Sequence, residues 1–399
     1  MTASWFVRVC LWTGLMTTGL FAIRPMISYR AIELQATTAQ IGLIAAAFGL
    51  VSFVLAIPVG RWIDRVGEVP FFVGGSVIMA GVGFWLIDAD TLWALFAAQA
   101  LLGAGQIIGL IALQSLVANG SSGELRDGMF GMFAVTGSLG TAIGPALGGW
   151  IASMPGGSLQ QVFLVSGLVM IVMTVVAVTL QYWPAPNRDR TNDAPSAPMA
   201  MFSVVGRIMR IRSMPQAMLS GMTVLAVIDL LVAYLPVYGE ANGLSVATVG
   251  VLLAVRAATS TLSRLAMVVL IRRFGRRHVF IGSLLLPAVA MFALPVLPHV
   301  PTLMVLMAFA GFGLGLGQPM SASWVAGTAP SDLRATALGV RLTGNRLAQA
   351  ILPALAGGIG GAAGISAVFL GMGALLSGSA AFVLTADFDD TPGRRTRAP

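Results

Sequence analysis

Charged side chains that interrupt long apolar runs are the residues of this chain best suited to chemistry. Five arginines and one carboxylate have this placement: Arg24, Arg256, Arg264, Arg341, Arg346 and Asp229. A charged side chain is costly inside a bilayer, so each one is by default a functional candidate. One acid cannot neutralise five guanidinium groups, and arginine does not deprotonate. An anionic ligand would offset the excess, because a guanidinium group forms paired hydrogen bonds with carboxylate or phosphate.

Arg256 and Arg346 lie near the middle of their runs, where we expect contact with a substrate. Arg341 is a further candidate, but it lies nearer the end of its run. Like Arg264, it could instead extend to the membrane surface or cap a helix end. Three amides could add hydrogen bonds to the same ligand: Asn345, Gln349 and Gln318.

Asp229 and Glu33 are the acids placed to load and release a proton. Arg24 has two interpretations, a ligand contact or a structural pair with Asp229. An internal repeat, described below, puts these two residues at comparable depth. Glu33 follows Arg30 by three positions at a run boundary, so these two residues could also pair with each other.

The composition indicates the class of protein that carries these charges. The chain has 399 residues, 57% hydrophobic and 10% charged, whereas soluble domains carry about 25% charged residues. Uncharged runs of about 20 residues recur along it, each long enough to span a bilayer as a helix. A membrane barrel needs alternating polar and apolar residues, which these runs lack. We predict an all-α membrane protein with twelve spans, at residues 5–27, 38–59, 71–88, 91–118, 128–152, 160–182, 216–238, 246–270, 279–297, 302–325, 335–360 and 364–386.

The arginines also predict how the chain is oriented. The net charge is +8, and all 23 basic residues are arginine. They concentrate in alternate loops and at the termini, which marks those sides as cytoplasmic and makes a nucleic-acid partner unnecessary. We therefore expect both termini in the cytoplasm of a multi-pass protein of the cell (inner) membrane. The first run has no small-residue cleavage site, so we expect a retained span.

A repeat with an offset of 208 positions shows that the chain is built twice. Residues 124–151 align without a gap on 332–359, and Gly42 aligns with Gly250. We predict a six-helix bundle at 1–182, a cytoplasmic linker at 183–215, a second bundle at 216–386 and a cytoplasmic tail at 387–399. Two halves of the same topology imply a pseudo-twofold axis along the membrane normal, with a site between them.

The loop after the second span reads GRWIDRVG and has glycines on both sides of an Asp-Arg pair. The residues concerned are Gly60, Asp64, Arg65 and Gly67. This loop resembles the cytoplasmic signature of the major facilitator superfamily, in which the charges hold neighbouring helix ends together. The second copy retains only Arg273 and Gly275. The resemblance implies a fold of two pseudo-symmetric six-helix bundles and a role for these loops in gating.

The fifth span contains GTAIGPALGG, which resembles the superfamily's antiporter motif, typical of exporters. Its residues are Gly140, Gly144, Pro145, Gly148 and Gly149, preceded by Arg126 at the entry to the span. Small residues four apart allow helices to approach closely, and proline permits a bend. We interpret this helix as a joint between moving halves; simple helix packing is the alternative. Many proton-coupled members carry an arginine four residues before Gly103, where this chain has Gln99.

These features favour a secondary active transporter that exports a small organic compound with an anionic group, against inward proton flow. Uptake or exchange of an organic or inorganic anion is the alternative, and a non-transporting membrane sensor is a more distant one. We do not expect an enzyme, because no metal-ligand cluster falls within a span and no phosphate-binding Walker loop is present. We expect no metal or cofactor, and we expect the monomer to be functional.

Overall fold

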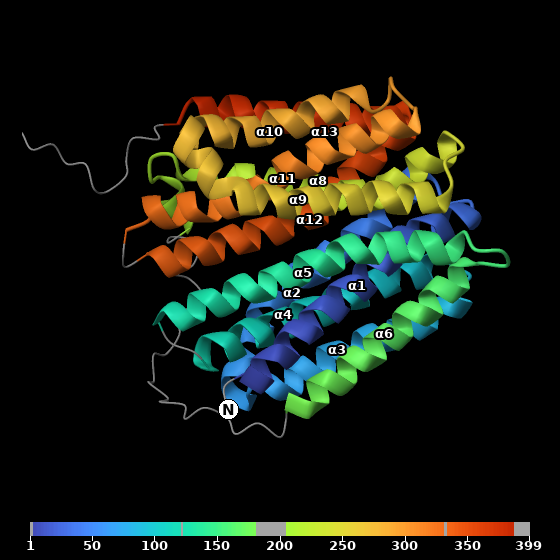
Figure 1. Ribbon diagram of the computed structural model, residues 1–399, viewed down its shortest axis with the longest axis horizontal. Coiled ribbons are helices and arrows are strands. Elements are labelled where there is room, and N and C mark those ends of the chain that lie inside the picture. The colour runs from blue at the N-terminus through green and yellow to red at the C-terminus, as the bar shows by residue number, and fades with distance from the viewer. Residues whose placement is uncertain (1–2, 121–122, 181–204, 331–332, 387–399) are drawn as a thin grey trace, which may run out of the picture.

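The computed structural model describes residues 3–120, 123–180, 205–330 and 333–386, and within these ranges the chain forms helices and no strand (Figure 1). The helices are α1 (Ala3–Glu33), α2 (Thr38–Val66), α3 (Glu68–Trp85), the short 3-10 helix η1 (Leu86–Asp88), α4 (Leu92–Gly120), α5 (Gly123–Ala152), α6 (Leu159–Thr179), α8 (Met214–Ala241), α9 (Val246–Phe274), α10 (Arg276–Ala293), α11 (Val300–Thr328), α12 (Arg334–Ala363) and α13 (Ile365–Leu384). Each predicted span overlaps one of the long helices, so the all-helical prediction is confirmed.

The helix ends differ from the predicted spans by a few residues, for local reasons. The span predicted to reach 297 ends at Ala293, because Pro295 has no backbone N–H to continue the helical hydrogen bonds. The span predicted to start at 71 begins at Glu68, directly after Gly67.

The repeat is visible in the way α2 and α9 begin and end. Thr37 caps α2 by accepting from the backbone N–H of Gln40, and Ser245, 208 positions later, caps α9 in the same way. Both helices end at a glycine with positive φ, Gly67 (113°) and Gly275 (77°). Only glycine adopts such backbone without strain, which explains why this residue is kept in both copies.

Ten of the long helices in the described ranges are apolar enough to cross a membrane by their own composition, which confirms a multi-pass membrane protein. The remaining two, α5 and α12, are equally long, but they are rich in glycine and contain charged residues. The count of twelve spans therefore stays a prediction, as does the cytoplasmic placement of the termini. The tail at 387–399 and most of the linker at 183–215 lie outside the described residues.

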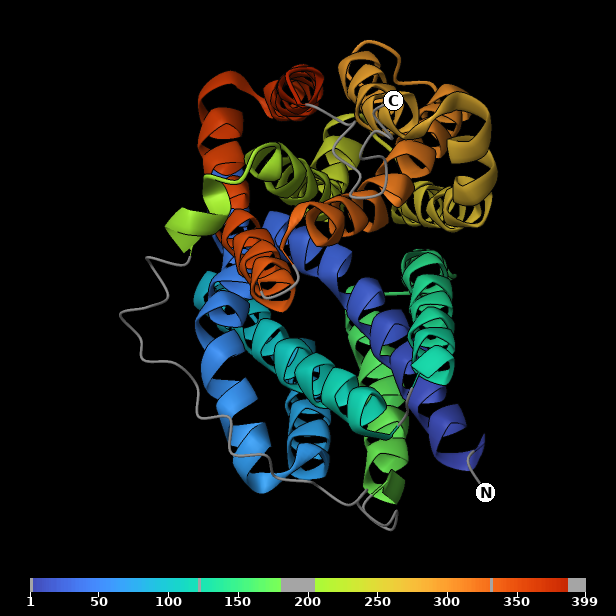
Figure 2. The same cartoon turned by 90° about the vertical axis from the view of Figure 1, so that its left-hand side faces the viewer.

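The helices form two groups, α1–α6 and α8–α13, lying side by side with their axes roughly parallel (Figures 1 and 2). We call one end of the molecule the arginine-rich end, because the α2–α3 and α9–α10 turns there carry Arg61, Arg65, Arg273, Arg276 and Arg277. The other end, where α2 and α9 begin, is called the opposite end.

Toward the opposite end the two groups touch through glycines related by the repeat. A Cβ on Gly42 of α2 would collide with the backbone of Pro353 and Gly357 in α12. A Cβ on Gly250 of α9 would collide with Pro145 and Gly149 in α5. The 208-residue offset converts one set of contacts into the other. These two seams bring backbone against backbone and close the opposite end.

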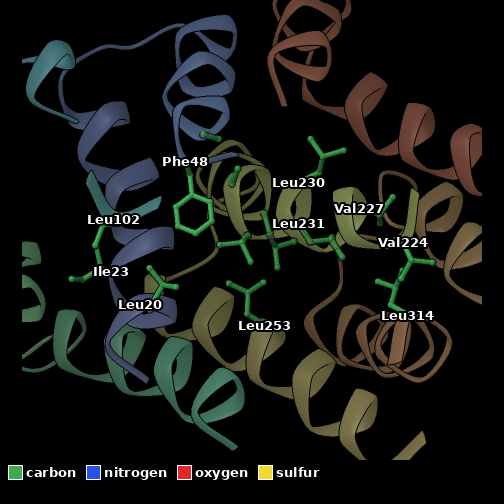
Figure 3. Close-up of a cluster of buried hydrophobic side chains, with 14 of the residues drawn as sticks. Leu20, Ile23, Phe48, Leu102, Val224, Val227, Leu230, Leu231, Leu253 and Leu314 are labelled. Atoms are coloured by element: carbon green, nitrogen blue, oxygen red, sulfur yellow. The ribbon is translucent and has the colours of Figure 1, made fainter. Parts of the chain in front are cut away.

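The middle of the molecule is a continuous apolar core that both groups share. Figure 3 shows part of it, with Leu20, Phe48 and Leu102 of the first group near Leu231 and Leu253 of the second. All of these side chains are fully buried. Charged groups placed in such surroundings interact strongly, because little water screens them.

Candidate substrate and coupling site

A buried ion pair joins the two groups of helices at this level. The Nη1 atom of Arg24 (α1) lies 2.6 Å from Oδ1 of Asp229 (α8), and each residue is 4% exposed. The Arg24 guanidinium also lies over the ring of Phe48 (α2), 4.1 Å from its centroid. Of the two interpretations of Arg24, the structure therefore shows the pair with Asp229.

The ion pair continues into a chain of hydrogen bonds on α12. Gln349 donates from Nε2 to the second oxygen of Asp229 and accepts at Oε1 from Nη1 of Arg346, at 2.9 Å. The same Arg346 nitrogen lies 3.5 Å from Oε1 of Gln106 on α4. Arg24, Asp229, Gln349 and Arg346 thus form one network, in which a change of charge at one member alters the others.

A cavity of about 280 Å³ lies beside Arg346, between the two groups of helices. Its walls are α2 and α4 on one side and α12 on the other. Arg346, Gln114 and Thr343 are its polar lining, and the rest is mainly apolar: Phe53, Ala56, Ile57, Ile107, Leu110, Ile111, Gly339 and Leu342. The cavity occupies the halves of α2 and α12 nearer the arginine-rich end, away from the glycine seams.

Arg256 is the buried charged residue with the most nitrogens that lack a hydrogen-bond partner within the described residues. It lies on α9 and is 2% exposed, yet its Nε and Nη2 atoms have no hydrogen-bond partner within the described part of the chain. A buried donor without a partner is destabilising, and a buried guanidinium without a counterion is more so. Such a group is expected where a ligand supplies the missing acceptor.

Arg341, by contrast, is held by its own half of the molecule. It donates from Nε to the Ser321 hydroxyl at 3.1 Å, and from Nη2 to the carbonyl and side-chain oxygens of Gln318, at 2.9 and 2.7 Å. Asn345 donates to the same Gln318 side chain at 3.3 Å. Since Arg341 is 6% exposed, it does not extend to the membrane surface. The structure thus brings together Gln318, Arg341 and Asn345 as a second network, on α11 and α12.

Arg264 connects the two groups of helices near this level. It donates from Nη1 to the hydroxyl of Ser138 on α5 at 2.7 Å, and from Nε to the carbonyl of Gly315 at 3.2 Å. Ser138 is the repeat equivalent of Arg346. At this position the second copy has a charged residue, Arg346, whereas the first copy has a serine that accepts a hydrogen bond from Arg264 of the second group.

Glu33 lies apart from these networks. It is the last residue of α1, at the opposite end, is exposed, and accepts from Arg30 Nη1 at 2.9 Å. The expected Arg30–Glu33 pair is present. A role for Glu33 in proton transfer stays a prediction, and the structure brings no other candidate residue to it.

The glycines of the fifth span face two different neighbouring helices. Gly140, Gly144 and Gly148 face α1 of the same group; a Cβ on Gly144 would meet the Thr18 carbonyl at 2.5 Å. Gly149 instead faces α9 of the other group, where a Cβ would meet the Val246 carbonyl at 2.8 Å. The packing interpretation thus describes three of these glycines, and Gly149 is the one at the interface between the groups.

The signature loops of the two copies have the same turn geometry at Gly67 and Gly275, but the motif arginines there are exposed to the surroundings. Gly67 and Gly275 form the turns described above, while Arg65 and Arg273 are exposed. A Cβ on Gly60 would meet nothing, so no packing requires that glycine. The side chains of Asp64 and Arg126 lie outside the described residues. The gating roles of these loops therefore stay predictions.

Gln106 is a site residue that sequence reasoning missed. It is a neutral polar residue next to Gly105 in the uncharged fourth helix, and its amide lies beside Arg346 and the cavity. A single amide in an apolar run is a weak signal. Its proximity to Arg346, 240 positions away, depends entirely on how the two groups of helices meet.

Comparison with known proteins identifies relatives along the whole chain. The family model described as Major Facilitator Superfamily matches residues 9–245 and 218–399. The multidrug resistance protein MdtH of Yersinia pestis is 28% identical over 347 residues, which is 84% of this chain and 82% of that protein. The inner membrane transport protein YajR of Escherichia coli is 27% identical over 175 residues, 44% of this chain and only 37% of that protein.

Solved structures with a similar fold are also transporters. The nucleoside transporter NupG superposes with a TM-score of 0.76 at 16% identity, covering 96% of this chain and 98% of that one. A bacterial homologue of the human lysosomal transporter Spinster, in an inward-facing and occupied conformation, superposes with a TM-score of 0.75 at 15% identity, covering 95% of both chains. At these identities the likeness concerns the fold alone.

Proposed function

Because the chain belongs to the major facilitator superfamily, whose matched members are transporters and not enzymes, we propose that it is a proton-coupled exporter of a small organic anion in the cell (inner) membrane. The observation that supports the anionic preference is the buried guanidinium of Arg256, two nitrogens of which have no hydrogen-bond partner in the part of the chain that the structure describes. A carboxylate or phosphate group supplies both charge and acceptors to such a residue.

The cavity beside Arg346 supports the other half of the substrate description. It offers one guanidinium and two neutral polar groups in a mainly apolar lining, so it suits a compound with an apolar body and one anionic group. Substrate sites with few polar groups in apolar walls are common. We place the anionic group between Arg256 and Arg346 and the apolar body along α2 and α4.

The contrast between the two ends of the molecule supports transport by alternating access. The glycine seams close the opposite end, while the cavity lies toward the arginine-rich end. Since arginine-rich loops are cytoplasmic, this arrangement corresponds to a state that loads from the cytoplasm. Export would then require the seams to part as the other end closes.

Proton coupling is assigned to Asp229. In an exporter driven by inward proton flow, the proton returns on the empty carrier. A proton added to the carboxylate from outside cancels the charge that holds Arg24 and releases this contact between α1 and α8, so that the empty site can return to the cytoplasmic side. Loss of the proton there restores the Arg24–Asp229 pair, 2.6 Å apart in this structure, before the next anion binds. A buried carboxylate that alternates between a cation and a proton is a recognised relay in membranes.

Direction is supported by two further observations. The GTAIGPALGG run resembles a motif typical of exporters, and the relative that covers most of this chain is named a multidrug resistance protein. Anion exchange without protons is the second candidate, because Gln99 replaces the arginine of the usual proton relay and Asp229 is already paired.

Flux in everted membrane vesicles distinguishes the two candidates. We expect accumulation of labelled organic anions to collapse when an uncoupler dissipates the proton gradient, and to be absent in Arg256→Gln and Arg346→Gln vesicles. Flux that survives the uncoupler and needs an anion on the far side establishes exchange. Wild-type rates in both variants would remove the anion site.

A further inference from the structure

A second, larger cavity lies on the outside of the second group of helices, away from the substrate site. It measures about 520 Å³ and opens between α9 and α10, with α11 as its floor. Its lining is almost wholly apolar and includes Leu270, Phe274, Leu286, Val289, Phe312 and Leu316. We call it the α9–α10 groove. An apolar groove open to the surroundings of a membrane protein faces lipid.

The length of the groove corresponds to one leaflet of a bilayer. Along α10 its lining runs from His278, in the first turn, to Val289. Eleven residues of helix rise about 16 Å, close to half of a hydrocarbon core of about 30 Å. An acyl chain anchored at the arginine-rich end would therefore lie along the groove and end near the bilayer centre.

Four arginines flank the α9–α10 turn, at the arginine-rich end of this groove. Arg272 and Arg273 end α9, and Arg276 and Arg277 begin α10. None has a carboxylate partner within the described ranges; Arg276 donates to the Ser323 hydroxyl and Arg277 to the Leu384 carbonyl, both at 3.1 Å. The N-terminus of α10 has no side-chain cap, so its free N–H groups add to the positive potential at the same place.

The first half of the chain does not repeat this arrangement. The 208-residue offset puts Asp64 where the second copy has Arg272, and Glu68 where it has Arg276. Glu68 is moreover buried and accepts from Ser115. For the orientation of the chain in the membrane, two arginines near such a turn are enough, and the first half has them in Arg61 and Arg65. The concentration of four arginines beside an apolar groove therefore belongs to the second half only.

We propose that the α9–α10 groove is a binding site for one anionic phospholipid, with an acyl chain along the groove and the phosphate among Arg272, Arg273, Arg276 and Arg277. Basic clusters next to membrane helices attract anionic lipid headgroups. A lipid bound here would link the last turns of α9 to α10 and α11. Arg256 and Arg264 lie further back on the same α9 helix.

The test compares thermal unfolding of the purified protein in detergent with added phosphatidylglycerol or with phosphatidylcholine. For the wild type we expect phosphatidylglycerol to raise Tm by about 3 °C more than phosphatidylcholine does. The double variant Arg276→Gln/Arg277→Gln should lose most of that difference. Arg61→Gln/Arg65→Gln removes the same charge from the first-half loop and should retain it.

Gly282→Leu tests the groove itself. Gly282 lines the groove, and a Cβ there would meet nothing within 4 Å, so the leucine enters the space for the acyl chain without a clash. We expect this variant to lose most of the lipid-specific difference while unfolding at an unchanged or higher Tm in detergent alone. Comparing the two lipids within each variant removes any general effect on stability.

Three results would overturn the proposal. The first is an equal response to both lipids in the wild type. The second is an unchanged phosphatidylglycerol response in Gly282→Leu, which would leave surface charge as the sole cause. The third is an equal rise in Tm with inorganic phosphate, which would indicate an anion site that needs no lipid.

Discussion

At the scale of residues, the five arginines of the apolar runs have different surroundings and therefore different expected roles. Arg24 has a carboxylate partner, Arg341 has hydrogen-bond acceptors on α11, and Arg256 has neither for two of its nitrogens. Burial alone does not separate them, because all three are at most 6% exposed. We therefore assign a structural role to an arginine whose nitrogens have protein partners, and a ligand-binding role to one whose nitrogens lack them.

Replacing Arg256 should abolish stabilisation by anions without lowering the stability of the ligand-free protein. We expect Arg256→Gln to unfold at an equal or higher temperature without ligand, because it removes a buried charge two of whose nitrogens have no hydrogen-bond partner within the described ranges. The variant should no longer be stabilised by mono- and dicarboxylates or sugar phosphates. Arg341→Gln is the matched control: it breaks satisfied hydrogen bonds and should cost about 1–3 kcal/mol. Anion-dependent stabilisation that persists in Arg256→Gln contradicts this assignment.

The Arg24–Asp229 pair should behave as a unit in unfolding experiments. Arg24→Gln leaves an isolated buried carboxylate and should lower the free energy of unfolding by about 3 kcal/mol. The double variant Arg24→Gln/Asp229→Asn removes both charges and should recover most of that loss. If the two single effects simply add in the double variant, the pair contributes nothing as a pair.

At the scale of elements, the glycines of α5 serve two interfaces. Gly144 and its neighbours one turn away allow α1 to approach within the first group, whereas Gly149 lies at the seam with α9. The motif therefore has glycines at two different interfaces, so we expect its members to have two different roles. The stripe four residues apart packs one group of helices, and the adjacent position contacts the other.

Adjacent substitutions in α5 should therefore differ. Gly149→Leu places a side chain against α9 and should shift the protein toward a state in which the seams are open. Gly148→Leu faces α1 and should leave that balance unchanged, although it loosens packing. A cysteine at Ala350, buried near the α2–α12 seam in a Cys10→Ser background, reports the difference through labelling by a polar maleimide. Equal labelling in both variants would contradict the division.

At the scale of the whole molecule, the twofold arrangement makes the closed end a pair of equivalent contacts. Gly42 against Pro353 and Gly250 against Pro145 are the same contact, generated twice by the repeat. The charges are not repeated in this way: Phe48 is the equivalent of Arg256, and Ser138 that of Arg346. Symmetry is kept where the halves close and lost where the substrate is expected.

Fixing the closed end should stop transport without removing the site. A Cβ on Gly361 of α12 would lie 3.7 Å from the Cβ of Ala39 on α2, a separation suited to a disulfide. We expect Ala39→Cys/Gly361→Cys, in a Cys10→Ser background, to lose flux on oxidation and regain it on reduction, while anion-dependent stabilisation remains. Each single cysteine variant is the control. Full flux by the oxidised, cross-linked protein would show that the seam need not open.

The helices, the two-copy construction and the list of candidate residues followed from the sequence by itself, because they depend on local composition and on a linear comparison. The repeat also paired Gly67 with Gly275 and Gly42 with Gly250, but it did not show that the first pair adopts positive φ or that the second pair lies at contacts between the two groups of helices.

Only the tertiary structure decided how the charges are partnered. Arg24 and Asp229 are 205 positions apart, and Gln106 and Arg346 are 240 apart. The repeat put Arg24 and Asp229 at comparable depth and left a pair as one of two interpretations, but only the packing of the two groups of helices showed which one holds. A rotation of one helix by a quarter turn would leave its hydropathy unchanged and separate these groups. The fold thus determined that Asp229 is held by Arg24 and Gln349, while two nitrogens of Arg256 have no hydrogen-bond partner among the described residues.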